Sequence, residues 1–185
     1  MSAETEAVLT VAGLMALAAR TAPKACGLDS IAIEILTGKE QEKLGKKMIQ
    51  IAEETGLVFF RINGEQVRNS NATVIIGVTG EKALGLNCGA CGHTSCEDMI
   101  KAGVVAKSHT TDFRGPNCAF KVTDLGIAMG SAVKTAGIHN VDNRIMYTAG
   151  LAAMKLGMLS GCSIVYGIPL SVSGRNIYWV APVDH

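Results

Sequence analysis

The stretch Thr73–Val78, with the sequence TVIIGV, predicts a strand that is buried on both faces, because it is a short apolar run rich in β-branched residues. A cysteine-rich segment follows it, and a long apolar helix is expected after that segment, over about 118–137. The cysteine-rich segment, residues 84–118, is therefore predicted to be an insertion between a core strand and a core helix. The whole chain, residues 1–185, is expected to form a single domain around that strand.

Four cysteines of this segment have the spacing of an iron–sulfur site. Cys88, Cys91 and Cys96 fall within nine residues, and Cys118 follows at a distance, behind a Gly-Pro turn. Each iron of a 4Fe–4S cluster needs one terminal thiolate, and these four thiols supply one each. The spacing therefore predicts Cys88, Cys91, Cys96 and Cys118 as the metal ligands.

The residues around the thiols favour the same chemistry. Thr94 and Glu97 have the pattern of a capping box, which predicts a helix that places Cys96 in its first turn. Free N–H groups and the positive end of the helix dipole would then face an anionic cluster. Gly89 and Gly92 allow the loop to turn its own N–H groups toward the sulfurs.

Other metal sites remain open as alternatives. A structural zinc ion held by the same cysteines is the main one, although such sites usually consist of two close pairs, and here Cys96 and Cys118 are 21 residues of chain apart. A Rieske centre needs two histidine ligands, and only His93 stands among the cysteines. Disulfides require an oxidising compartment. We expect His93 to be a loop residue near the cluster.

The remaining candidates are expected to have structural roles. Cys26 is predicted to be a small buried residue in a turn, and Cys162 a buried residue that opens a strand. Asp124, Asp142 and Arg144 could line a pocket, but helix capping and ion pairing explain them equally well. We assign no catalytic residue, and whether the protein is an enzyme stays open.

Charge and hydropathy exclude some classes of partner. The net charge is +1 and there is no extended basic run, so no nucleic-acid partner is expected. The apolar run 7–19 is too short to span a bilayer. Glu4 and Glu6 precede it where a signal peptide would carry positive charge. We expect a buried helix there, no membrane association and a cytoplasmic location.

The other elements are expected to alternate between helix and strand, which predicts an α/β or α+β fold in three layers. Gly and Ala at 126–132 predict close packing of helices, including packing across a homodimer. The expected helices are 4–20, about 38–55, 64–70, about 118–137 and 142–157, and the further strands are 30–36, 163–168 and 176–180.

The sequence also resembles known families. The run NCGACGHTSCEDM followed by GPNC is similar to the four-cysteine 4Fe–4S module of electron-transport complex subunits and corrinoid iron–sulfur proteins. Nearly the whole chain resembles a family of uncharacterised ferredoxin-domain-containing proteins of anaerobic prokaryotes. The segments that carry this second resemblance are LMALAARTAPKACGLD, GLNCGACG, GPNCA, LGIAMGSAVKTA, NVDNRIMY and GIPLS.

The frame around the cysteines resembles FMN-dependent nitroreductases, on AARTAPKACGLDSIAIEIL, DLGIAMGSAVKTAG, GLAAMKLGM and IVYGIPLS. This resemblance implies an α+β homodimer with interlocked helices and bound FMN. It also implies a nitroreductase-like three-layer fold that carries the cysteine-rich segment as an insertion. The family's Arg-rich phosphate-binding signature has no counterpart in this chain, so Arg20, Lys24 or Arg175 would have to replace it.

Three functions follow as expectations. The first is electron transfer through a 4Fe–4S cluster, as a redox protein or an oxidoreductase component with an unknown redox partner. The second is a non-catalytic structural or regulatory module that holds zinc or a sensing cluster. The third is an FMN-dependent, nitroreductase-like oxidoreductase in which the cluster feeds the flavin.

Overall fold

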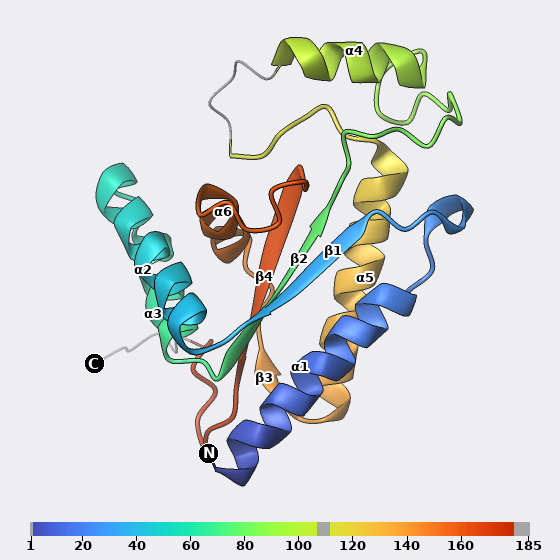
Figure 1. The fold of residues 1–185 in the computed structure, drawn as a ribbon. Helices are drawn as coiled ribbons and strands as arrows, with labels where there is room; N and C mark the ends of the chain where they lie inside the picture. Colours follow the sequence, from blue (N-terminus) through green and yellow to red (C-terminus); the bar gives the residue numbers. More distant parts are fainter. Residues whose placement is uncertain (1, 107–111, 180–185) are drawn as a thin grey trace.

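The computed structural model describes residues 2–106 and 112–179 of the chain. At its centre is one sheet with the strand order β1-β2-β4-β3 (Figure 1). Each pair of neighbouring strands is antiparallel. The strands are β1 (Ile31–Leu36), β2 (Ala72–Val78), β3 (Asp142–Asn143) and β4 (Ile164–Ser171).

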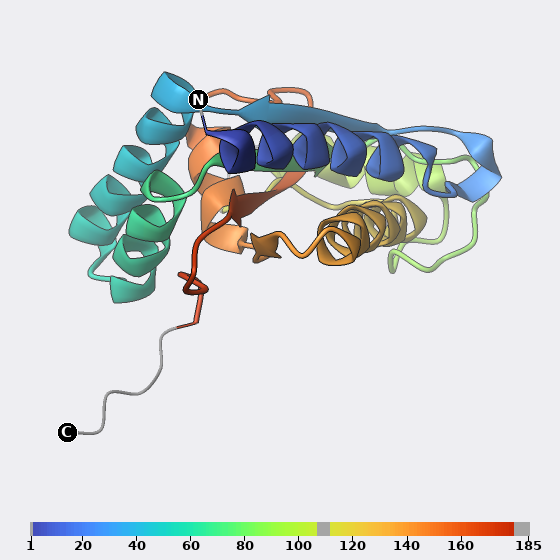
Figure 2. The same ribbon diagram turned by 90° about the horizontal axis from the view of Figure 1, so that it is seen from below.

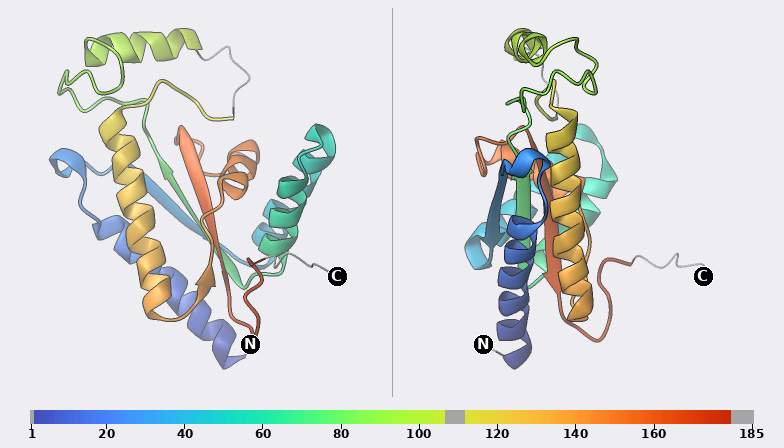
Figure 3. Two further views of the ribbon diagram at one scale, coloured as in Figure 1. Left: turned by 180° about the vertical axis from the view of Figure 1, so that it is seen from behind. Right: turned by 90° about the vertical axis from the view of Figure 1, so that its right-hand side faces the viewer.

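Helices cover both faces of the sheet. Helices α1 and α5 pack on one face, and α2, α3 and α6 pack on the other, as Figures 2 and 3 show. The predicted three-layer α+β fold is therefore confirmed. The helices are α1 (Ala3–Thr21), α2 (Gly38–Thr55), α3 (Val58–Arg68), α4 (Cys96–Ala106), α5 (Ala119–Ile138) and α6 (Tyr147–Lys155), with a short 3-10 turn η1 (Ala25–Gly27) after α1.

Strand β2 is the centre of both hydrophobic cores. Every one of its residues is buried, as the continuous apolar run predicts. Val74 and Ile76 lie in the core beneath α1 and α5, whereas Ile75 lies in the core beneath α2, α3 and α6. Because successive side chains of a strand point to opposite faces, a strand between two helical layers needs an apolar residue at every position.

The two N-terminal helices follow their sequence patterns closely. The apolar residues that recur at helical spacing in α1 are the ones that are buried, namely Val8, Val11, Ala12, Met15 and Ala19. Helix α2 ends at Gly56, whose φ of 74° places it in the left-handed region that glycine adopts without strain. Thr37 and Glu40 have the spacing of a capping box, but the Thr37 side chain makes no capping hydrogen bond.

Three boundaries differ from the sequence prediction. The helix expected over 142–157 begins only at Tyr147, because Asp142–Asn143 pair with the end of β4 as strand β3. Residues 176–179 form no strand, and Val180, the last residue of the strand predicted there, lies outside the described residues. The short helix expected over 64–70 is longer and earlier, since α3 spans Val58–Arg68.

The small residues of α5 have two different environments. Ala128 and Ala132 are fully buried in the core that α5 shares with α1. Gly126 and Gly130 are exposed, and a Cβ added to either would meet no atom of the described residues within 4 Å. Close packing within the chain therefore involves the alanines, and the glycines leave an open, nearly side-chain-free surface.

No helix within the two described ranges has both the length and the apolar character needed to cross a membrane.

Candidate metal centre

The four predicted ligands line one cavity, at the end of the sheet where α4 lies (Figure 1). Cys88 and Cys91 come from the loop before α4, Cys96 is the first residue of α4, and Cys118 immediately precedes α5. Cys88 is exposed, Cys91 and Cys96 are partly buried, and Cys118 is buried. The structure thus brings together thiols that are distant in the sequence, with the outermost one facing solvent.

The loop before α4 is folded around Cys96. The Asn87 side chain accepts a hydrogen bond from the backbone N–H of Cys96 at 2.8 Å, and the backbone N–H of Asn87 donates to the Cys96 sulfur at 3.4 Å. Gly89 and Gly92 have φ angles of 73° and 85°, and the N–H of Gly92 donates to the carbonyl of Gly89 at 2.9 Å. The glycines therefore close a tight turn around Cys91, and the N–H of Gly92 bonds within this turn instead of facing a sulfur as expected.

Helix α4 is capped by a different pair from the one predicted. The hydroxyl of Ser95 accepts from the N–H of Asp98 at 3.1 Å, and the hydroxyls of Thr94 and Ser95 donate to the Asp98 carboxylate at 2.8 and 2.7 Å. The hydrogen bond from Ser95 holds the pKa of Asp98 below its usual value. Glu97 instead pairs with Lys101. The capping acid is Asp98 because the cap lies one residue later than the Thr94–Glu97 pattern indicates.

Cys118 is held to the sheet by a polar network that the sequence does not reveal. Its backbone N–H donates to the Gly80 carbonyl at 2.8 Å. The neighbouring Asn117 accepts from the Ser163 hydroxyl at 2.5 Å and donates to the Arg114 carbonyl at 2.6 Å. Ser163 in turn accepts from the N–H of Gly80 at 3.0 Å. The fourth thiol therefore stands on a scaffold built from β2, the start of β4 and the chain before α5.

The donor set fits an iron–sulfur cluster in chemistry. Four thiols are present, a backbone N–H points to one of the sulfurs, and His93 lines the same cavity without belonging to the donor set. The enclosed space is narrow, about 10 Å³, which is roughly the room for one water molecule. A 4Fe–4S cluster is larger than this space, so its binding would require the lining residues to move apart.

The thiols that line the cavity stand apart from one another. Within the described part of the chain, no three His, Cys, Asp or Glu side chains stand close enough together to hold one metal ion. The four cysteines therefore surround a common cavity without converging on a single point.

Two of the three cations proposed for a flavin phosphate are engaged in structural bonds. The Arg20 guanidinium pairs with Asp29 and also donates to the carbonyl of Ile31. The Lys24 ammonium donates to three backbone carbonyls at the end of α1. Arg175 is exposed after β4, and its side chain makes no hydrogen bond or ion pair with the described residues. Of these three cations, only Arg175 has a side chain that no bond to the described residues occupies.

The two remaining cysteines lie outside the cavity. Cys26 is exposed and has a φ of 56°, so the expectation of a buried turn residue is wrong in its burial. The reason is that η1 turns outward after α1. Cys162 is buried as expected, and burial raises the pKa of its thiol. Neither thiol is among those that line the cavity.

The other polar candidates have structural partners. Both carboxylate oxygens of Asp124 accept from the N–H of Ala25, at 3.0 and 3.2 Å. Asp142 accepts from the Asn176 side chain at 2.9 Å. The Arg144 guanidinium donates to the Tyr178 carbonyl at 3.4 Å, and Arg144 lines an open hollow beside the exposed Trp179. These residues do not assemble into one site.

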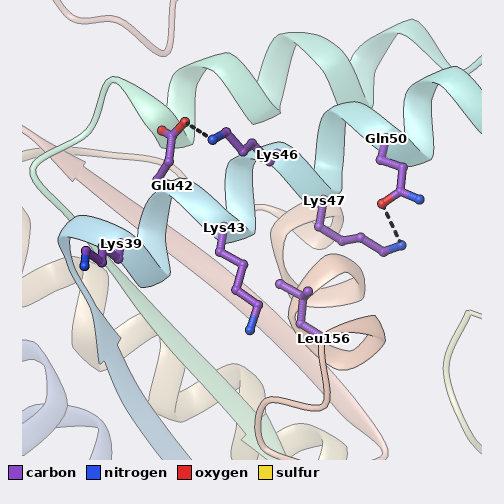
Figure 4. A pocket seen from close by; sticks show the side chains of 7 residues that line it. All are labelled: Lys39, Glu42, Lys43, Lys46, Lys47, Gln50 and Leu156. Carbon is purple, nitrogen blue, oxygen red and sulfur yellow. Dashed lines mark hydrogen bonds and ion pairs between the residues drawn. The ribbon is translucent and has the colours of Figure 1, made fainter.

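A second hollow lies on α2, in the helical layer opposite to α1 and α5. It encloses about 500 Å³ and is lined by four lysines, Glu42, Gln50 and Leu156, as Figure 4 shows. Lys46 pairs with Glu42 at 3.2 Å, and Lys47 donates to Gln50 at 3.1 Å. None of the predicted metal or flavin residues is among its lining, so we regard the cysteine cavity, although much smaller, as the functional one.

The sequence is similar to a family of proteins and to an individual relative. A family described as "Uncharacterized protein containing a ferredoxin domain" matches residues 114–179, which include Cys118 and β4. An "Uncharacterized protein" of Archaeoglobus fulgidus is 45% identical over 174 residues, which are 94% of this chain and 91% of that protein.

Solved structures share the fold at low sequence identity. Nitroreductase A from Vibrio parahaemolyticus is 14% identical, with a TM-score of 0.52, over 95% of this chain and 60% of that one. An oxidoreductase containing FMN is 12% identical, with a TM-score of 0.55, over 97% and 71%. Nitroreductase CinD from Lactococcus lactis, solved with nicotinic acid, is 11% identical, with a TM-score of 0.55, over 97% and 84%. The chain thus has the nitroreductase fold, and it spans less than two thirds of the first of these proteins.

Proposed function

Because this chain belongs to the family of uncharacterised proteins that contain a ferredoxin domain, we propose that it is an electron-transfer protein. It binds one 4Fe–4S cluster through Cys88, Cys91, Cys96 and Cys118. The observation that carries the proposal is that these four thiols, from three separate parts of the chain, line one cavity. When bound, such a cluster supplies reversible one-electron transfer.

The spacing of the thiols supports a cluster over zinc. A single zinc ion would draw its four sulfurs to within about 4 Å of one another, because each Zn–S bond is about 2.3 Å long. The thiolates of a 4Fe–4S cluster bind four separate irons and stand farther apart. Along the chain Cys88 and Cys91 form one close pair, but Cys96 and Cys118 are separated by 21 residues, and this spacing favours the cluster.

Individual residues of the chain would stabilise the charge of the cluster, bond to its sulfur ligands and fix its position. Cys96, at the start of α4, places the site next to the positive end of the helix dipole, which favours an anion. The N–H of Asn87 donates to the Cys96 sulfur. Buried Cys118 fixes the site to the sheet, and exposed Cys88 marks the side on which a redox partner can approach.

An FMN-dependent oxidoreductase is the second candidate, and the fold favours it. One of the solved structures with this fold is an oxidoreductase that contains FMN. Arg20 and Lys24 cannot hold a phosphate without giving up their present bonds, so Arg175 is the remaining candidate. In this version the cluster would pass electrons to the flavin.

We further propose that the protein is a homodimer. Helices α1 and α5 lie side by side, and their outer surfaces expose Leu14, Leu17 and Ile127, next to Gly126 and Gly130. Burying such residues against a second copy would remove apolar surface from water, and the glycines would let two helices approach closely.

An optical spectrum of anaerobically purified protein tests these functions together. A broad visible absorption that dithionite bleaches supports the cluster, and additional flavin bands support the FMN candidate. A spectrum without visible absorption, from protein that contains zinc, would refute the proposal and favour the non-catalytic zinc module.

A further inference from the structure

The loop that carries three of the four cysteines is closed at its base by one residue. Asn87 stands directly before Cys88, and it contacts Cys96, the first residue of α4. The Asn87 side chain accepts a hydrogen bond from the N–H of Cys96 at 2.8 Å, and the N–H of Asn87 donates to the Cys96 sulfur at 3.4 Å. Because these two bonds are reciprocal, the stretch 87–96 forms a closed loop.

Asparagine suits this position in two ways. Its φ is 47°, in the left-handed region that asparagine and aspartate tolerate better than other residues with a Cβ. Its side-chain oxygen also satisfies the N–H of Cys96, which has no partner within α4 because it belongs to the first turn of that helix. Glycine at this position would keep only the backbone conformation, whereas aspartate would keep both properties.

The closed loop forms a wall of the cysteine cavity. Asn87 lines the cavity together with Cys88, Cys91 and Cys96. These three thiols are therefore carried on one closed unit, whereas Cys118 is held separately, by its bond to the sheet. A cluster needs more room than the cavity offers, so the lining has to move apart when the cluster binds. A closed loop can move as a unit and keep its thiols together.

We propose that Asn87 is a positioning residue of the site, an inference that rests on the proposed 4Fe–4S cluster. It closes the loop 87–96 before any metal arrives, and it so presents three ligands together. An open loop would lose more conformational entropy when a cluster fixes it, and this loss opposes binding. The closed loop has already lost part of that entropy, so it should hold a cluster longer.

The first test follows the amide hydrogen of Cys96 by NMR in iron-free protein. In the wild type this hydrogen should exchange slowly with solvent deuterium, although it lies at the first position of a helix. Asn87→Gly keeps the backbone conformation but removes the acceptor, and it should speed the exchange at least about fivefold, the ratio that corresponds to one hydrogen bond. Asn87→Asp keeps the acceptor and should restore slow exchange.

Asn140→Gly is the matched control for the change of residue type. Asn140 also has a left-handed φ, of 54°, and it is exposed just after α5, outside the lining of the cysteine cavity. This variant makes the same substitution at a position of similar backbone conformation. Its Cys96 amide should exchange at the wild-type rate.

The second test measures the release of iron to a chelator from protein that was loaded without oxygen. Asn87→Gly should release iron about fivefold faster than the wild type, because the loop that holds three ligands is no longer closed. Asn87→Asp should release iron more slowly than Asn87→Gly. Asn140→Gly should match the wild type.

Each outcome decides the question. Equal exchange of the Cys96 amide in the wild type and in Asn87→Gly would overturn the inference, because the side-chain bond would then not hold the loop in solution. Equal rates of iron release from these two proteins would overturn it too, as would an equal change in Asn140→Gly. Wild-type protein without iron would instead refute the proposed function, and the amide exchange would still decide whether Asn87 closes the loop.

Discussion

Replacing Gly80 with alanine should loosen the fourth cysteine. A Cβ at this position would overlap the Asn117 side-chain oxygen and would lie 3.0 Å from the Ser163 hydroxyl. Asn117 cannot stay where it is, so its hydrogen bonds to Ser163 and to the Arg114 carbonyl are lost. Cys118 follows directly and donates its own N–H to the Gly80 carbonyl, so the change reaches the thiol.

The expected loss of stability can be worked from these bonds. Each hydrogen bond contributes about 1 kcal/mol net, and the N–H of Gly80 also loses its bond to Ser163 if the hydroxyl moves, so Gly80→Ala should cost about 2–3 kcal/mol. With a urea m-value of roughly 2 kcal/mol/M, the unfolding midpoint of iron-free protein should fall by about 1–1.5 M. In iron-loaded protein, a chelator should remove iron faster than from the wild type.

Gly137→Ala provides the matched control. Gly137 lies near the end of α5, and an added Cβ there meets nothing within 4 Å among the described residues. Alanine is favoured over glycine in a helix by up to about 1 kcal/mol, so this variant should be at least as stable as the wild type. If Gly80→Ala unfolds at the wild-type midpoint and loses iron at the wild-type rate, the role given to the Gly80–Asn117–Ser163 network is wrong.

Three further predictions follow from other parts of the molecule. Serine at Cys88, Cys91, Cys96 or Cys118 should abolish or degrade the cluster, whereas Cys26→Ser and Cys162→Ser should keep full iron. Cys162→Ser should also lose about 1–3 kcal/mol of stability, because a hydroxyl enters a buried apolar site. Full iron in Cys118→Ser together with iron loss in Cys26→Ser would show that the fourth ligand is misassigned. Light scattering of the wild type should give about twice the 19.3 kDa mass of one chain. Gly126→Trp should reduce the measured mass to that of one chain. A monomeric wild type would contradict the homodimer. Burial and the hydrogen bond to the Asp112 carboxylate raise the pKa of Tyr147 from 10.0 to about 12, so stability that is present below pH 10 should be lost as the pH rises to about 12. Unfolding midpoints measured across this pH range should show no such loss of stability in Tyr147→Phe. Identical pH profiles for the variant and the wild type would refute this prediction.

The fold was predictable where the signal is local. The apolar run of β2, the spacing of the buried residues of α1 and the glycine that ends α2 each depend on neighbours in the sequence, and the structure confirms them. Strand β3 was missed because it exists only by pairing with the end of β4, about 30 residues later in the chain. The strand expected over 176–180 has the apolar content of a strand, but its described residues form no backbone pairing with any strand.

The candidate site was likewise predictable only where its signal lies in a short stretch of sequence. The cysteine spacing gives the four thiols that share the cavity, but Gly80 and Ser163 are 83 residues apart and no short pattern connects them.

The measurement that tests the account most directly is the iron and sulfide content of protein expressed and purified without oxygen from iron-replete cells. The account predicts about four irons and four sulfides per chain, the content of one 4Fe–4S cluster. One zinc per chain with no iron would contradict it.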